Sequence, residues 1–113
     1  MRSATPSMAN SNAVTREVLL SFWKVHILHH AASRAVYGQW IMEELRRHRY
    51  NISPGTVYPL IRRMEKNGWL KRAGTKGNRP NARKEFRLTT KGTKILKLLR
   101  KKVVELYLEV VSE

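Results

Sequence analysis

The sequence predicts a mostly helical fold with one small β-hairpin, and three observations support it. Apolar residues recur at helical spacing in four stretches of the chain. Between the third and fourth stretches, two short segments flank a loop rich in Gly, Pro and Asn, which is typical of a hairpin. The chain has 113 residues, a length that suits one domain with one modest core.

The charge of the chain indicates a polyanionic partner. Lys and Arg number 23 against 8 acidic residues, so the formal net charge is +15. Most of the basic residues lie between Arg46 and Lys102, where only Glu65 and Glu85 are acidic. Such an imbalance favours nucleic acid as the partner, with an anionic membrane surface as the second candidate.

Several classes of protein are disfavoured by what the sequence lacks. The absence of cysteine excludes disulfides, thiolate zinc sites and cysteine nucleophiles. No apolar run approaches the roughly 20 residues of a membrane-spanning helix, and the first residues lack the apolar block of a signal peptide. We therefore expect a cytoplasmic location and no membrane partner.

A first helix is predicted over residues 14–32, with apolar residues on two of its faces. Val18 and Phe22 lie in one stripe and Trp23 in the other. One face can pack on the core of the domain, so the other needs a further partner, most simply a second copy of the chain. We expect these three residues in a dimer interface. Residues 1–12, rich in Ser, Asn and Ala, are expected to form a flexible tail.

A second helix is predicted over residues 37–47, with Tyr37, Ile41 and Leu45 in line. Gly38 near its start indicates close approach to a neighbouring backbone. Basic residues end this helix, and cations there favour the negative end of the helix dipole.

The third predicted helix covers residues 53–67. Ser53 can cap it, Pro54 suits its first position, and Gly68 follows its end. Its apolar residues share one face that can seat on a core: Val57, Leu60, Ile61 and Met64. Its other face carries small or basic residues and no acid: Gly55, Thr56, Pro59, Arg62, Arg63 and Lys66. Such a face can enter the groove of a polyanion, so we interpret this segment as a DNA recognition helix.

Pro59 disturbs the hydrogen bonding of this helix, because it cannot donate to the carbonyl of Gly55. In one reading the helix starts a second time here, and residues 53–55 form a loose first turn. In the other, a kink at Pro59 sets how the first turn enters the groove. The sequence is compatible with both.

Residues 69–73 and 85–88 are predicted to pair as a hairpin, because they read as two short strands around a turn-rich loop. Arg79 at the tip of the loop is placed to enter a narrow minor groove. The loop carries no acid, and its four basic residues are candidate DNA contacts: Lys76, Arg79, Arg83 and Lys84.

A long last helix is predicted from Thr89 or Thr90, one of which caps it, to about Val111. Apolar residues follow an alternating four-three spacing along one side, as in a heptad seam. Seam residues and one flanking tyrosine complete the expected dimer interface: Leu96, Leu99, Val103, Leu106, Tyr107 and Val110. The expected division is a winged-helix domain at 13–89 and a dimerisation helix at 90–113.

The predicted order of elements is that of a winged helix-turn-helix with an added dimerisation helix. Six blocks carry a closer resemblance: Tyr37-Gly38, Gly55-Thr56-Val57-Tyr58-Pro59-Leu60, Met64-Glu65, Gly68-Trp69-Leu70, Arg83-Lys84-Glu85-Phe86 and Leu88-Thr89-Thr90-Lys91-Gly92. In these residues the chain resembles the short branch of the PadR family of bacterial and archaeal transcriptional regulators.

The resemblance implies a sequence-specific homodimeric repressor on a palindromic operator in double-stranded DNA. The third helix would lie in the major groove and the wing at the adjacent minor groove. Family members that bind planar drugs between subunits place a tryptophan on the last helix, and this chain has none there. The sequence therefore does not support a small-molecule effector, and no cofactor is expected.

Arg62 and Arg63 are the candidate base contacts, since a guanidinium can hold O6 and N7 of guanine with two parallel hydrogen bonds. The alternative is that both, like Lys66, contact only phosphates.

Three further residues near the start of the helix are candidate phosphate contacts. Ser53 and Thr56 lie where hydroxyls and free N–H groups favour phosphate, although Ser53 can equally be a simple cap. Tyr58 can offer its hydroxyl to phosphate while its ring packs on the hairpin, and a purely structural role is the alternative.

The sequence favours other functions less. His26, His29 and His30 have a spacing that can hold a metal, but no cysteine or neighbouring acid supports a site, so packed or interfacial histidines are expected. No Gly-rich phosphate loop, nucleophile elbow or carboxylate pair indicates an enzyme. Two rivals remain: a non-specific architectural or RNA-binding protein, and an adaptor whose long helix binds another protein.

Overall fold

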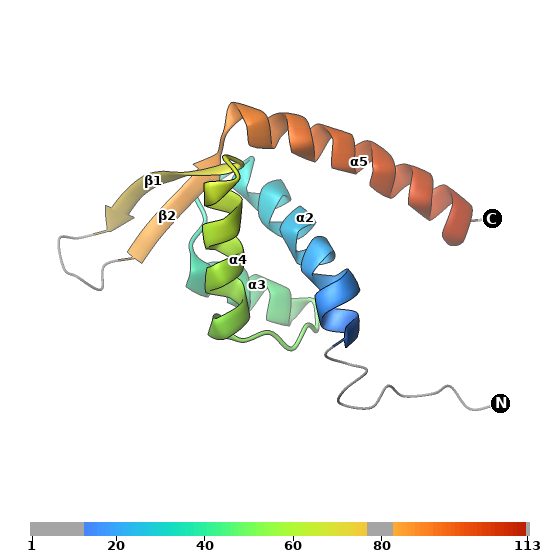
Figure 1. Cartoon of the computed structure of the whole chain (residues 1–113), viewed down its shortest axis with the longest axis horizontal. Coiled ribbons are helices and arrows are strands. Elements are labelled where there is room, and N and C mark those ends of the chain that lie inside the picture. The colour runs from blue at the N-terminus through green and yellow to red at the C-terminus, as the bar shows by residue number, and fades with distance from the viewer. Residues whose placement is uncertain (1–12, 77–82, 113) are drawn as a thin grey trace.

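The computed structural model describes residues 13–76 and 83–112 (Figure 1). The elements are the π-helical turn η1 (Thr15–Leu19), α2 (Leu20–Ala31), α3 (Gly38–Arg47), α4 (Pro54–Lys66), β1 (Leu70–Lys76), β2 (Arg83–Leu88) and α5 (Thr90–Val110). The predicted fold class is confirmed, because the chain is mostly helical with one two-stranded antiparallel hairpin. The predicted tail at 1–12 lies outside the described residues.

Three elements differ from the sequence prediction, one of them the second strand, which begins at Arg83 and not at residue 85. The first helix opens with η1 rather than as one continuous α-helix over 14–32. The first strand extends to Lys76 instead of ending at residue 73, because β1 keeps pairing with β2 across a bulge between Arg72 and Gly74.

One hydrophobic core joins the helices to the hairpin. The apolar face predicted for α4 is confirmed, since Val57, Leu60, Ile61 and Met64 are all buried. Burying each such side chain stabilises the fold by about 1.5–3 kcal/mol. This packing also turns the opposite face of α4 away from the core.

Two residues predicted for the dimer interface are buried within their own chain. Trp23 and Leu96 are each 2% exposed, and the ring of Trp23 packs edge-to-face on Tyr50. The prediction is wrong for these two residues. Because α2 and the start of α5 pack on each other, their apolar stripes meet inside the chain at this end.

The hairpin is attached to the helices at both of its strands. Val36, in the link after α2, exchanges backbone hydrogen bonds of 2.9 and 2.8 Å with Phe86 of β2. Thr89 caps α5, as one of the two predicted threonines, and accepts a hydrogen bond from the N–H of Gly92 at 2.8 Å. The Thr89 hydroxyl also donates to the carbonyl of Gly68. These contacts hold the hairpin beside α4.

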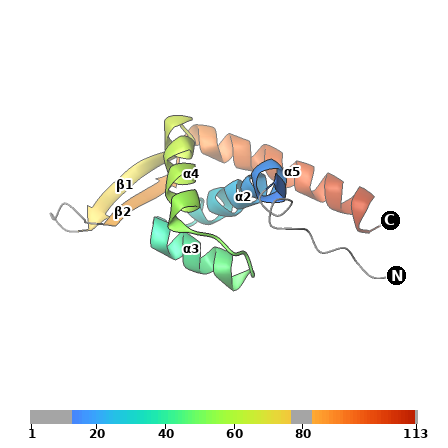
Figure 2. The same cartoon turned by 60° about the horizontal axis from the view of Figure 1, so that its bottom comes forward.

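The last helix leaves the domain along its length. Its first turns pack on α2 and β2, whereas all described residues from Lys101 to Ser112 are exposed. Figures 1 and 2 show this C-terminal half extending beyond the other helices. None of the helices in the described ranges is long and apolar enough to cross a membrane.

Candidate nucleic-acid interface

The first turn of α4 presents two hydroxyls near its N–H groups. Ser53 occupies the N-cap position with an extended backbone, but its side chain makes no capping hydrogen bond. Its hydroxyl oxygen instead lies 3.4 Å from that of Thr56. The predicted Ser53 cap is therefore present in backbone position only. The free N–H groups of this turn can still attract an anion.

Pro59 lies inside α4, and the helix runs from Pro54 to Lys66 as one element. The reading in which a second helix starts at Pro59 is therefore wrong. The core explains this continuity, because Val57 and Leu60 on either side of the proline are fully buried. Gly55, whose carbonyl loses the hydrogen bond from residue 59, is exposed.

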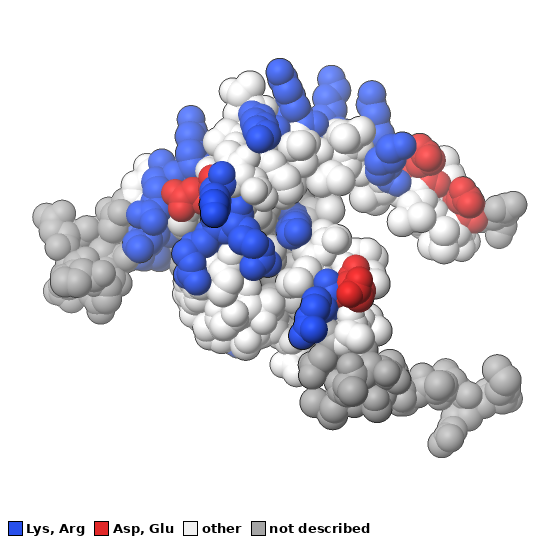
Figure 3. Space-filling view, in the orientation of Figure 1, with Lys and Arg blue, Asp and Glu red and all other residues white. Residues whose placement is uncertain are grey.

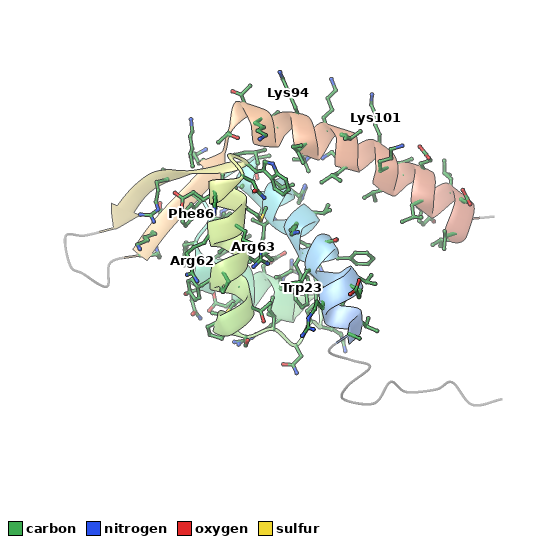
Figure 4. All side chains as sticks on the ribbon, in the orientation of Figure 1. Trp23, Arg62, Arg63, Phe86, Lys94 and Lys101 are labelled. Atoms are coloured by element: carbon green, nitrogen blue, oxygen red, sulfur yellow. The ribbon has the colours of Figure 1, made fainter. Side chains whose placement is uncertain are left out.

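Three cations line the outer face of α4. Arg62, Arg63 and Lys66 are all exposed, and in the part of the chain that the structure describes none has an acid within ion-pair distance. The nearby acid, Glu65, pairs with Arg72 of β1 at 3.4 Å. Figure 4 shows Arg62 and Arg63 on different sides of α4, and Figure 3 shows basic side chains gathered over α4 and the hairpin.

A cleft of about 480 Å³ separates α4 from the hairpin. Its lining combines cations with aromatic rings, and it includes Tyr37, Tyr58, Arg62, Arg72, Arg83 and Lys84. A cleft of this composition suits a phosphate group or the edge of a base.

Two of the arginines in the cleft are held against aromatic rings. The guanidinium carbon of Arg83 lies 3.8 Å from the ring centroid of Tyr37, and Arg83 also pairs with Glu85 at 3.0 Å. Arg72 lies 5.5 Å from the ring of Phe86. Tyr37 and Arg72 were not predicted as site residues. The signal for Tyr37 in the sequence was the adjacent Gly38, which marks the crossing of α3 and α4.

Gly38 and Tyr58 form that crossing. A Cβ atom on Gly38 would overlap the ring of Tyr58, so the close approach expected at this glycine involves a side chain and not a backbone. The ring of Tyr58 therefore packs on the start of α3, while 40% of the residue remains exposed. Tyr58 has both a packing role and an accessible edge.

Two of the four predicted loop cations lie in the hairpin with described side chains. Arg83 and Lys84 begin β2 and are exposed. Lys76 ends β1, where its backbone pairs with Arg83. Arg79 lies outside the described residues.

A histidine cluster joins α2 to α3, away from the cleft. The carboxylate of Glu44 lies 2.7 Å from Arg47, 3.2 Å from His48 and 3.4 Å from His30. The hydrogen bond from Arg47 lowers the pKa of Glu44 to about 2. Burial lowers the pKa of His26 and His30 below 6.5. In the described ranges, no three His or acidic side chains are placed to hold a metal ion.

An apolar groove of about 360 Å³ lies between α2 and the outer half of α5. It is lined by Phe22, Val25, His26, His29, Val103 and Leu106. Of the predicted interface residues, Val18, Phe22, Val103, Leu106, Tyr107 and Val110 are between 43% and 69% exposed. Leu99 is partly buried against the core.

The third helix, seated on the core and exposed beside a hairpin, defines a winged helix-turn-helix protein. Solved structures share this fold. A PadR-like transcription factor from Bacteroides fragilis is 24% identical, with a TM-score of 0.74 over 87% of this chain and 95% of that one. A PadR-like transcriptional regulator from Bacillus cereus is 25% identical, with a TM-score of 0.70 over 87% and 92%.

The model of the transcriptional regulator PadR-like family matches residues 27–98. The transcriptional regulator Rv3488 of Mycobacterium tuberculosis is 40% identical over 99 residues, which cover 86% of this chain and 90% of that protein. This chain belongs to the PadR family of transcriptional regulators, which act by binding DNA and are not enzymes.

Proposed function

We propose that the chain is a homodimeric repressor that binds a palindromic operator in double-stranded DNA. In this proposal α4 lies in the major groove and the hairpin contacts the adjacent backbone or minor groove. The outer face of α4 carries the proposal, because it is exposed and free of acid while the opposite face is buried. Its cations need not leave an acidic partner among the described residues before they bind.

The two arginines of α4 are proposed to read bases. Arg62 borders the cleft and Arg63 lies on another side of the helix, so together they span the width of α4 (Figure 4). Lys66 near the helix end, and Ser53 and Thr56 at its start, are proposed to bind phosphates on the flanking strands.

The hairpin and the rim of the cleft are proposed to position the protein on the backbone. Arg83 and Lys84 face the cleft together with Tyr58. Phosphate contacts from these residues would set the register of α4 without selecting a sequence. Lys76 and Arg79 extend the same basic segment in the sequence, and we propose that they contact the backbone or the minor groove.

The apolar groove and the exposed end of α5 support a homodimer. Val103, Leu106, Tyr107 and Val110 are each at least half exposed, which is unusual for one contiguous apolar surface. A second copy that offers the same surface would cover the apolar groove and the exposed end of α5 together, as in a two-fold interface. Two copies of α4 related by that axis would require a palindromic operator, and occupancy of the operator would exclude polymerase.

A non-specific nucleic-acid-binding protein is the second candidate, and the net charge of +15 favours it. The two candidate functions differ in the ratio between the affinity for a preferred duplex and the affinity for unrelated duplexes. A regulator should prefer one duplex by about 10³-fold or more.

Selection of bound duplexes from a random pool tests the proposal. We expect enrichment of one palindromic sequence, and sedimentation of the complex should give two chains per duplex. If the dimer neutralises roughly eight phosphates, log affinity should fall with log salt with a slope near −7. A pool that stays random after selection, or RNA that competes as well as the enriched duplex, would favour the non-specific candidate.

A further inference from the structure

A second basic surface lies on α5, separate from the cleft. Lys94, Lys97 and Lys101 are exposed, and their spacing of three and four residues places them on one side of the helix. Figure 4 shows Lys94 and Lys101 projecting in the same direction, away from the body of the molecule. A row of basic side chains along this edge is visible in Figure 3. We call these three residues the lysine ridge.

The lysine ridge lies opposite the apolar side of α5. At about 100° per residue, Lys94 and Lys101 fall about 140–180° from Leu96 and Val103, and Lys97 falls about 100–120° from them. A second copy of the chain seated on the apolar groove would therefore leave the ridge exposed. The ridge also points away from α4 (Figure 4). A straight duplex held by α4 would not lie along it.

The charge pattern of α5 opposes the stability of the helix. From Lys91 to Lys102 the helix has six cations and no acid, and its first turn, at the positive end of the helix dipole, has no acid either. Like charges three or four residues apart destabilise a helix by about 0.2–0.5 kcal/mol per pair. In the described part of the chain, Lys102 of this segment pairs with an acid, Glu105 at 3.8 Å, but no ridge lysine does.

The hairpin continues this pattern beside the start of α5. Lys71 of β1 lies directly opposite Arg87 of β2, and both are exposed. Like charges facing each other across strands are destabilising. An arrangement that holds like charges together at the expense of local stability is explained if a polyanion binds them.

The ridge differs chemically from the cleft. An ammonium group on a flexible stem binds phosphate as a point charge, whereas a planar guanidinium favours defined, bidentate geometry. From Lys94 to Lys101 the ridge spans about 10 Å at 1.5 Å per residue. A duplex carries one charge per about 1.7 Å of its axis, so it can neutralise all three lysines at once.

We propose that the lysine ridge binds the backbone of a second DNA duplex without regard to sequence, while α4 holds the operator. This inference rests on the proposed DNA-binding function. A dimer has two ridges, so one operator-bound dimer can hold a distant segment of the same chromosome close to the operator.

A duplex-bridging assay tests the proposal. A short duplex that just covers the preferred site is immobilised and saturated with protein, and a labelled unrelated duplex is then added. We expect the wild type to capture the label. The variant K94A/K97A/K101A should lose capture while its affinity for the short duplex stays within about twofold. Alanine favours helix, so α5 should still form, which circular dichroism verifies.

The variant R16A/K24A/K102A is the matched control, because it removes the same charge from residues outside the ridge. It should capture the label as the wild type does. In the wild type, three phosphate contacts should contribute about 2.7 to the log–log salt slope of capture.

Three results would overturn the ridge proposal. The first is that the wild type captures no label. The second is that the ridge variant captures as much label as the wild type. The third is that the ridge variant binds a long single duplex more weakly than the wild type does, although neither protein captures a second duplex. The last result would mean that the same duplex wraps onto α5. An acidic protein partner would likewise leave capture of DNA unaffected by the ridge. If the proposed function is wrong, selection from a random pool finds no preferred duplex. Bridging can then still be tested with two unrelated duplexes.

Discussion

The two basic surfaces of this chain differ in the cations they use and in how firmly those cations are held. In the cleft, Arg83 stacks on Tyr37, and Arg72 pairs with Glu65. On α5, Lys94 and Lys101 extend from an exposed helix with no acidic partner in the described residues. A held guanidinium can select a geometry, while a free ammonium recognises charge alone. The positive charge of the chain is therefore divided between two kinds of surface, which suit different tasks.

The largest effect is expected where the two surfaces join. Gly92 is buried in the first turn of α5, and a Cβ there would overlap the carbonyl oxygen of Trp69. Gly92→Ala forces α5 and the base of the hairpin apart, because the obstacle is backbone and cannot rotate away. Overpacking of this kind costs about 1–3 kcal/mol and occasionally more, and we expect about 3 kcal/mol. Urea unfolding measures the decrease in stability.

Gly55→Ala is the control for that substitution. Its Cβ would meet only the hydroxyl oxygen of Ser53, at an ordinary 3.7 Å. Alanine is favoured over glycine in a helix by about 1 kcal/mol, so this variant should be as stable as the wild type or more stable. Equal stability of the Gly92 variant and the wild type would show that the two surfaces are not rigidly joined.

The sequence predicted the features that depend on neighbours along the chain. The apolar face of α4, a threonine cap at position 89 or 90 and the order of elements all follow from local spacing, and the structure confirms them, with Thr89 as the cap. Features that depend on distant segments were missed or wrong. Trp23 was assigned to a partner because a single helix cannot tell which of its two apolar faces its own core will take.

The cleft shows the same limit. Tyr37 and Arg72 are 35 positions apart in sequence numbering and meet only because α3, α4 and the hairpin converge. Pro59 was ambiguous because the propensity of proline to break a helix competes with burial of the residues around it. Burial prevails here, since Val57 and Leu60 hold the backbone on the core.

The second prediction separates base reading from charge at the cleft, where Arg62 and Lys84 both lie. Arg62→Ala should lose about 1–3 kcal/mol of discrimination at one position in each half-site. Lys84→Ala should weaken all duplexes alike and reduce the salt slope by about 0.9 for each phosphate that is no longer neutralised. Binding of the preferred duplex and of single-base variants measures both effects. Identical specificity profiles in the two variants would remove the distinction.

The third prediction replaces an arginine of the cleft by lysine and a lysine of the ridge by arginine. Arg83→Lys keeps the charge but removes the stacking on Tyr37, which is worth about 0.5–1 kcal/mol at an exposed site. Operator affinity should fall by a few-fold. Lys97→Arg on the ridge should leave capture of a second duplex unchanged, because that surface needs charge alone. If neither substitution changes operator affinity or capture of a second duplex, the arginines of the cleft also act as simple charges.

The smallest effect is expected from pH, at the histidine cluster that lies apart from both surfaces. Besides each other and His29, the charged groups that face His26 and His30 include His48, Glu44 and Arg34. Burial lowers the pKa of His26 and His30 in the folded chain, so the unfolded chain binds protons first as pH falls. Their contribution to stability is present above pH 6.5 and is lost as pH falls below it.

Urea midpoints at about pH 7.5 and about pH 5.5 measure this dependence, and the midpoint should be lower at the acidic pH. Glu44, with a pKa of about 2, remains ionised throughout this range and does not contribute to the change. His26→Gln should flatten the dependence, whereas Ser21→Ala on the same helix should leave it intact. A midpoint that rises on acidification would mean that the ion pair of His30 with Glu44 outweighs the burial of the rings. Acid would then strengthen the contact between α2 and α3 that seats α4.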